Sequence, residues 1–123
     1  MTTIDAAALR RHIGTRIADE DTATEAPLKA IVATFDRQEE APRQGEPIPP
    51  GWHIGYFLSM ARTGALAADG LPRGAGVLPK VPLPRRMYAG ARLSFHAPIL
   101  VGDALRRETE LIDPARPRRQ RGV

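Results

Sequence analysis

The sequence predicts an α+β domain in which one amphipathic helix packs on a curved antiparallel sheet. Apolar residues recur at helical spacing between residues 24 and 37. From residue 87 to residue 97 apolar and polar residues alternate, which is the period of a strand with one buried face. A second alternating segment, residues 104–112, follows a turn at residues 98–103. We therefore expect these two segments to form an antiparallel hairpin.

The predicted helix at residues 24–37 begins with Thr24 as a capping residue and carries proline in its first turn. Its apolar stripe consists of Leu28, Ile31, Val32 and Phe35. A helix of this length is marginal alone in water, so it needs a covering surface. We expect that surface to be the apolar face of the long strand, made of Ala89, Ala91, Leu93 and Phe95.

A shorter helix is predicted near the start of the chain, with Thr3 as its N-cap and Gly14 at its end. Residues 16–21 fit either a brief strand or a loop. Residues 52–60 are apolar and aromatic and fit either a strand or the covered edge of a loop. Residues 69–84 read as a long loop rich in glycine and proline, without the GKS/T ending of a phosphate-binding loop.

Composition narrows the class of protein. The chain has 123 residues, 42% of them hydrophobic, which suits one domain with a modest core. It contains no cysteine, which excludes disulfides and thiolate chemistry. It has neither a long apolar run nor a signal-like start, so we expect a cytoplasmic protein that contacts no membrane.

The net charge of +4 comes entirely from the last ten residues, 114–123, which hold four arginines and no acid. Residues 1–113 are therefore neutral, and a nucleic-acid-binding face is not indicated. We expect residues 114–123 to form a disordered tail rich in arginine and proline. Loss of the reading frame or a shortened gene would explain it. A basic extension that binds an acidic partner remains the alternative.

Three ordered motifs carry a family resemblance. They are PP-x-WH-x-x-YFL, then LP-x-VPLPRRM-x-AG-x-RL-x-FH-x-P, then VGD. This order resembles the N-terminal half of the MaoC-like dehydratases, double hot-dog enzymes that include mesaconyl-CoA hydratases and 3-hydroxyacyl-thioester dehydratases. The resemblance runs from about residue 20 to residue 113. It implies a hot-dog-like fold for residues 1–113, as an incomplete N-terminal half of a double hot-dog.

The same resemblance implies an activity for the intact enzyme: reversible addition of water to a 2-enoyl thioester, giving a 3-hydroxyacyl thioester, with no cofactor. Such enzymes place an Asn or Asp and a His in their other half, in patterns such as N-x-x-H-x-D. This sequence contains no asparagine, and His12, His53 and His96 stand in no such setting. We therefore expect no catalytic residue and no metal site in this chain. His96 is expected to be a hydrogen-bonded or salt-bridged edge histidine.

Candidate substrate-binding residues remain. Trp52, His53 and Tyr56 would form one wall of an acyl groove, and Arg85 and Arg86 would face the phosphates of coenzyme A. Core packing for the aromatic residues and solvated charge for the arginines are the competing interpretations.

The partners implied are an acyl-CoA or other acyl-thioester substrate in the intact enzyme, and a catalytic hot-dog domain or subunit or a second copy of the chain. A non-enzymatic module that pairs in trans with a catalytic subunit is the alternative function.

Overall fold

The computed structural model describes residues 5–74, 76–79, 81 and 87–113. Within them the chain is a small α+β structure with one two-stranded antiparallel sheet. Its elements, in chain order, are α1 (Ala6–Arg10), β1 (Arg16–Thr22), α2 (Glu25–Thr34), the 3-10 helices η1 (Trp52–Gly55) and η2 (Thr63–Ala65), and β2 (Ala104–Glu110). Two compact units share the chain: one combines Ala18–Met60 with Leu93–Arg107, and the other holds the remaining segments.

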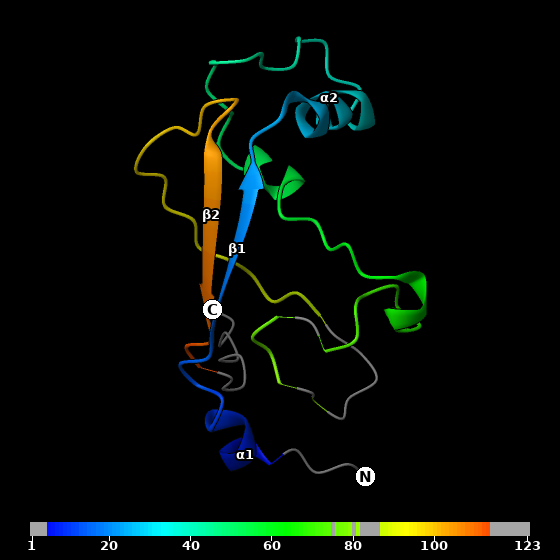
Figure 1. Cartoon of the computed structure of the whole chain (residues 1–123), viewed down its shortest axis with the longest axis vertical. Coiled ribbons are helices and arrows are strands. Elements are labelled where there is room, and N and C mark those ends of the chain that lie inside the picture. Colours follow the sequence, from blue (N-terminus) through cyan, green and yellow to red (C-terminus); the bar gives the residue numbers. More distant parts are fainter. Residues whose placement is uncertain (1–4, 75, 80, 82–86, 114–123) are drawn as a thin grey trace, which may run out of the picture. The chain divides into compact units, whose positions relative to one another are not determined.

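Strands β1 and β2 lie side by side although they come from opposite ends of the sequence (Figure 1). Backbone hydrogen bonds flank the ladder, from Gly14 N to the Leu111 carbonyl at 2.8 Å and from Ala23 N to the Asp103 carbonyl at 2.9 Å. The undecided segment 16–21 is therefore a strand. The turn at residues 98–103 and the strand after it are confirmed, with a hydrogen bond from Asp103 N to the Leu100 carbonyl.

The predicted strand at residues 87–97 is not formed, so the predicted hairpin is wrong. Strand β2 pairs with β1 instead. The side chains that were expected to face a core are open to solvent, with Leu93 61% and Phe95 53% exposed. Alternation describes a strand only when a neighbouring strand supplies hydrogen bonds and another layer covers the apolar face. Among the described residues neither is provided for this segment.

Helix α2 occupies most of its predicted range but ends at Thr34. Thr24 lies at the N-cap position as predicted, although its side chain makes no capping hydrogen bond. The predicted stripe is buried only toward the N-terminal half of the helix: Leu28 is fully buried, whereas Phe35 is 67% exposed.

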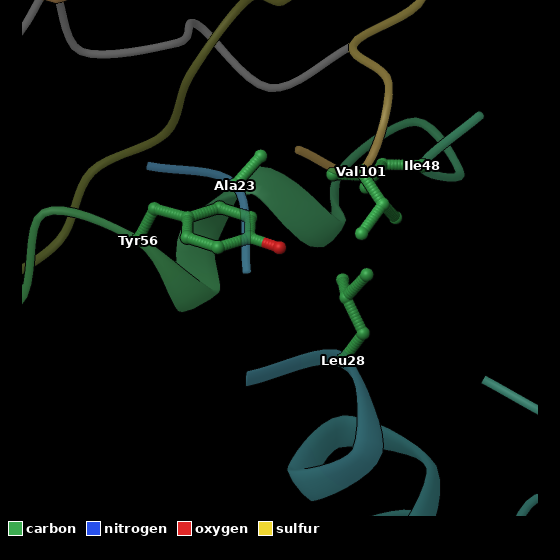
Figure 2. Packing of buried hydrophobic residues seen from close by; sticks show 5 residues of the cluster. All are labelled: Ala23, Leu28, Ile48, Tyr56 and Val101. Atoms are coloured by element: carbon green, nitrogen blue, oxygen red, sulfur yellow. The ribbon is translucent and has the colours of Figure 1, made fainter. Parts of the chain in front are cut away.

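The core cluster belongs to the unit that contains α2 (Figure 2). Its members are Ala23, Leu28, Ile48, Tyr56 and Val101. Figure 2 shows the Leu28 side chain, on α2, pointing toward Val101. The surface that covers α2 is η1 rather than the predicted face of residues 89–95. That prediction is wrong, because the segment expected to form the sheet face is not a strand.

Gly55, the last residue of η1, allows the close contact with α2. A Cβ at this position would lie 3.0 Å from Pro27 Cβ and 3.5 Å from Ile31 Cδ1. The first distance is tight for a methyl group, so a residue larger than glycine would require η1 or Pro27 to shift.

Helix α1 is capped by Asp5, whose Oδ1 accepts hydrogen bonds from Ala7 N and Ala8 N at 2.9 and 3.1 Å. Asp5 therefore takes the role predicted for Thr3, which lies outside the described residues. The helix ends at Arg10, and a turn leads to Gly14, which has a positive φ of 87°. The tail at residues 114–123 also lies outside the described residues. In the part of the chain that is described, no helix has the length and apolar character of a membrane span.

Candidate functional site: a proline-lined groove

A groove of about 420 Å³ opens in the unit formed by Ala18–Met60 and Leu93–Arg107. One wall is residues 47–51, three of which are prolines, and the other is residues 95–99. His53, on η1, also lines it. We call this feature the proline-lined groove. Its volume falls within the range of ordinary small-molecule sites.

Backbone hydrogen bonds hold the two walls together along one edge. Ile48 N donates to the Ile99 carbonyl at 2.8 Å, and Val101 N donates to the Glu46 carbonyl at 2.9 Å. Pro47 and Leu100 form an isolated antiparallel bridge between these bonds. Proline keeps its backbone extended and donates no hydrogen bond, so this wall does not continue into a wider sheet.

Helix η1 places His53 in the groove. It begins after Gly51, whose φ of 92° lies in the left-handed region that glycine tolerates. Trp52 N donates to the Pro49 carbonyl at 3.1 Å, which closes the first turn. The His53 and Phe95 rings then meet edge to face, with centroids 6.1 Å apart, and this contact links η1 to the wall at residues 95–99.

Two imidazoles are the polar side chains of the groove. His53 and His96 both line it, and among its described lining residues there is no carboxylate, lysine or arginine. Neither imidazole has a hydrogen-bond partner within the described part of the chain. The partner expected for His96 is therefore not found there.

The other predicted site residues lie elsewhere. Tyr56 is a core residue, 4% exposed, and its hydroxyl donates to the Thr24 carbonyl at 2.7 Å. Burial raises its pKa. Trp52 is half-buried against the same core, with the Arg37 guanidinium 5.4 Å above its ring. Both side chains therefore anchor η1. Arg85 and Arg86 lie outside the described residues.

A contact between Asp21 and Phe57, which the sequence did not suggest, holds the backbone shortly after the end of η1. Phe57 has a positive φ of 57°, an outlier for a bulky residue. Its backbone N–H donates to Asp21 Oδ2 at 2.7 Å, and Thr22 N donates to Asp21 Oδ1 at 2.7 Å. These two bonds lower the pKa of Asp21. The Asp21 carboxylate therefore holds a strained backbone at Phe57, shortly after the end of η1.

A side chain of strand β2, Arg107, lies over the aromatic ring of Phe57. The Arg107 guanidinium lies 4.8 Å over the Phe57 ring and pairs with Asp19 on β1 at 2.7 Å. No sequence motif signals these contacts, because they join three segments that are distant along the chain.

The described lining of the groove is apolar apart from the two imidazoles. Its walls are apolar, and no carboxylate stands beside either imidazole among the described lining residues. The described residues also contain no cluster of three or more His, Cys, Asp or Glu side chains that would hold a metal ion.

Sequence comparisons identify the class of protein. The profile of the family described as hydroxyacyl-thioester dehydratase type 2 matches residues 51–123, more than half of the chain, and the chain belongs to this family. The predicted resemblance to MaoC-like dehydratases is confirmed. The match continues past Asp113, so the expectation that the resemblance ends there was wrong.

A particular relative is mesaconyl-C(4)-CoA hydratase of Chloroflexus aurantiacus. It is 44% identical over 89 residues, which cover 72% of this chain and 32% of that protein. The chain thus spans about a third of the length of the curated relative that it matches.

Proposed function

We propose that this chain is the N-terminal, non-catalytic half of an acyl-thioester hydratase–dehydratase. The intact enzyme would add water reversibly to a 2-enoyl thioester, and a coenzyme A thioester related to mesaconyl-C(4)-CoA would be its substrate. The observation that carries the proposal is an apolar groove whose described lining residues include no acid–base pair, in a chain that belongs to a dehydratase family.

Hydration of an enoyl thioester requires a base that activates water, an acid that protonates the α-carbon, and donors to the thioester oxygen. The described lining of the groove supplies imidazoles but no carboxylate to orient one of them. We therefore assign binding to this half: Ile48, Phe95 and Ile99 contact the acyl chain, and Trp52 and Tyr56 support η1 from behind.

Arg85 and Arg86 are proposed to face the phosphates of coenzyme A. They follow the predicted loop at residues 69–84 in the sequence, and guanidinium groups pair well with phosphate oxygens.

The test of this function is a crotonyl-CoA hydration assay with the isolated chain, followed by loss of the enoyl absorbance, together with a binding measurement. We expect binding of crotonyl-CoA without turnover above background. Turnover that disappears in His53→Ala or His96→Ala would place catalysis in this half and refute the non-catalytic assignment. Absence of thioester binding would refute the substrate-binding role.

A second candidate function is a non-enzymatic module that completes a separate catalytic hot-dog subunit. The favouring observation is the small sheet, in which β1 and β2 have only each other as partners among the described residues. A mixing experiment distinguishes the two candidate functions: this chain and a catalytic hot-dog subunit are purified separately and then combined. A stand-alone module restores hydration when mixed with a separately encoded catalytic subunit. The half of a single enzyme has no such separate partner.

A further inference from the structure

The shape of the proline-lined groove depends on the position of η1, because η1 carries His53, whose ring centroid lies 6.1 Å from that of Phe95. We propose that Asp21 and Arg107 are positioning residues of this groove. Neither belongs to its described lining. Both contact Phe57, which follows η1 in the chain, and through Phe57 they hold η1 and His53. This inference concerns the geometry of the groove and holds whichever ligand the groove takes.

Helix η1 has little support of its own. It is a 3-10 helix of four residues, and helices of this kind have poorer hydrogen-bond geometry than α-helices. The residue before it, Gly51, has the wide conformational freedom of glycine. A single residue, Tyr56, separates the end of η1 from Phe57. A change of backbone direction at Phe57 is therefore transmitted to η1, because no flexible linker lies between them.

Contacts with α2 set the distance between the two helices. Gly55 packs close to Pro27, and the Tyr56 hydroxyl donates to the Thr24 carbonyl at 2.7 Å. These contacts come from one side of η1, so they leave the helix free to turn about that side. A second attachment, from a different element, is needed to fix the direction in which His53 points.

Asp21 on β1 supplies that attachment to the backbone. Its Oδ2 accepts the N–H of Phe57 at 2.7 Å, and Phe57 has a φ of 57°, in the left-handed region that bulky residues avoid. Such a conformation costs free energy and persists only where its surroundings enforce it. Without the carboxylate, Phe57 relaxes to a negative φ, and the chain that joins it to η1 changes direction.

Arg107 on β2 supplies a second attachment, to the side chain of Phe57. Two of its N–H groups donate to Asp19 Oδ2 at 3.2 and 2.7 Å, which orients the guanidinium. The guanidinium then lies 4.8 Å over the Phe57 ring. Asp19 and Asp21 are alternate residues of β1, so their side chains lie on the same face of the strand. Phe57 is thus held by its backbone and by its ring, both times from the β1–β2 sheet.

The imidazole protons of His53 report whether η1 is in place. The chain has three histidines, so the NMR signals of the imidazoles are few, and each is assigned by substituting that histidine. The Phe95 ring shifts the His53 signals as long as the two rings are in contact. Phe95→Leu therefore gives the reference value of the His53 signals without that ring.

Asp21→Ala removes both acceptor oxygens, and Arg107→Met removes the guanidinium but keeps an unbranched side chain. We expect each variant to move the His53 signals toward the values of the Phe95→Leu reference. The His12 signals should stay at their wild-type values, because His12 belongs to the other compact unit. Circular dichroism verifies that each variant is folded. If Asp21→Ala does not fold, Arg107→Met alone decides.

Arg16→Met is the matched control. Arg16 pairs with Glu110 across the same two strands at 2.9 Å, as Arg107 pairs with Asp19 at 2.7 Å, but Arg107 also lies over the Phe57 ring. The Arg16 pair joins the first residue of β1 to the last residue of β2. We expect this variant to leave the His53 signals unchanged. An equal change in Arg16→Met would assign the effect to a general loosening of the sheet and overturn the inference.

Binding of crotonyl-CoA to the full chain is the second measurement, and it rests on the proposed function. We expect Asp21→Ala and Arg107→Met to bind about two- to tenfold more weakly than wild type, as for one side chain that must be ordered on binding. Arg16→Met should bind as wild type does.

Unmoved His53 signals in folded Asp21→Ala and Arg107→Met overturn the inference and leave the proposed function intact. Unchanged affinity in variants whose His53 signals have moved overturns it too, since the position of His53 would then not matter to the groove. If crotonyl-CoA does not bind to the wild-type chain, the proposed function fails, whereas the His53 signals still decide the inference.

Discussion

At the scale of single residues, the carboxylate of Asp21 is the most informative group. It accepts the backbone N–H groups of Thr22 and Phe57, and the second bond holds Phe57 at a positive φ. Strained backbone of this kind persists only where its surroundings enforce it. Asp21 therefore fixes the backbone at Phe57, shortly after the end of η1.

We predict that Asp21→Asn lowers the melting temperature at neutral pH and that the difference from wild type shrinks in acid. The pKa of Asp21 is lower in the folded chain, because its ionised form accepts both backbone hydrogen bonds. Its stabilising contribution is therefore present above the pKa of an unfolded aspartate, about 4, and is lost as the pH falls through the lower folded value.

Thermal melts of both proteins between neutral pH and about pH 3 check this prediction. Glu20→Gln, at an exposed position on the same strand, is the control and should change little. A difference that stays constant over the whole pH range would show that the carboxylate charge is not what holds Phe57.

At the scale of secondary structure elements, local sequence patterns correctly predicted the helix start and the turn, because these features depend on local contacts. Thr24 at the start of α2 and the turn before Asp103 both occur where the sequence placed them. The prediction of a strand at residues 87–97 was wrong, because a strand also needs a partner strand and alternation in the sequence does not specify one. The β1–β2 pairing was missed for the same reason: it joins distant segments, and no local signal marks which strands meet.

The candidate site likewise combines residues that the local sequence identifies with long-range contacts that it does not. His53 was identified because it stands in an aromatic motif, and it does line the groove. An acyl groove was predicted, but walls at residues 47–51 and 95–99 were not, because these two segments meet through long-range backbone hydrogen bonds. Tyr56 and Trp52 were recognised as core candidates from their type, but their sequence spacing does not tell which residues they pack against.

Leu28 and Phe35 differ in burial although both belong to the apolar stripe of α2, and this difference predicts how their substitution affects stability. Leu28→Ala should lower the free energy of unfolding by about 2–5 kcal/mol, because it removes a fully buried side chain that packs toward Val101. Phe35→Ala changes a side chain of the same stripe that is 67% exposed, so its effect should be within about 0.5 kcal/mol. Urea denaturation of both variants measures the two values. Equal losses would mean that Phe35 is covered in solution.

At the scale of the whole molecule, the described residues leave much apolar surface without a covering layer. Large side chains at four positions of one unit are mostly exposed: Phe35, Ile54, Leu58 and Met60, by 67%, 68%, 63% and 90%. The described residues form a sheet of two strands, which is marginal by itself, and edge strands in general tend to pair with other chains. Exposed apolar residues of this size add to the tendency to associate.

We therefore predict that the isolated chain self-associates or melts with poor cooperativity. Sedimentation velocity over a range of concentrations should show a mass that rises with concentration, and the melt should be broad. The double variant Ile54→Glu and Leu58→Glu should shift the chain toward the monomer, because charge at these exposed positions opposes apolar contact. Glu20→Gln, which leaves the apolar positions unchanged, is the control. A wild-type monomer with a sharp two-state transition would contradict the prediction, since it would mean that the described core is sufficient without a partner.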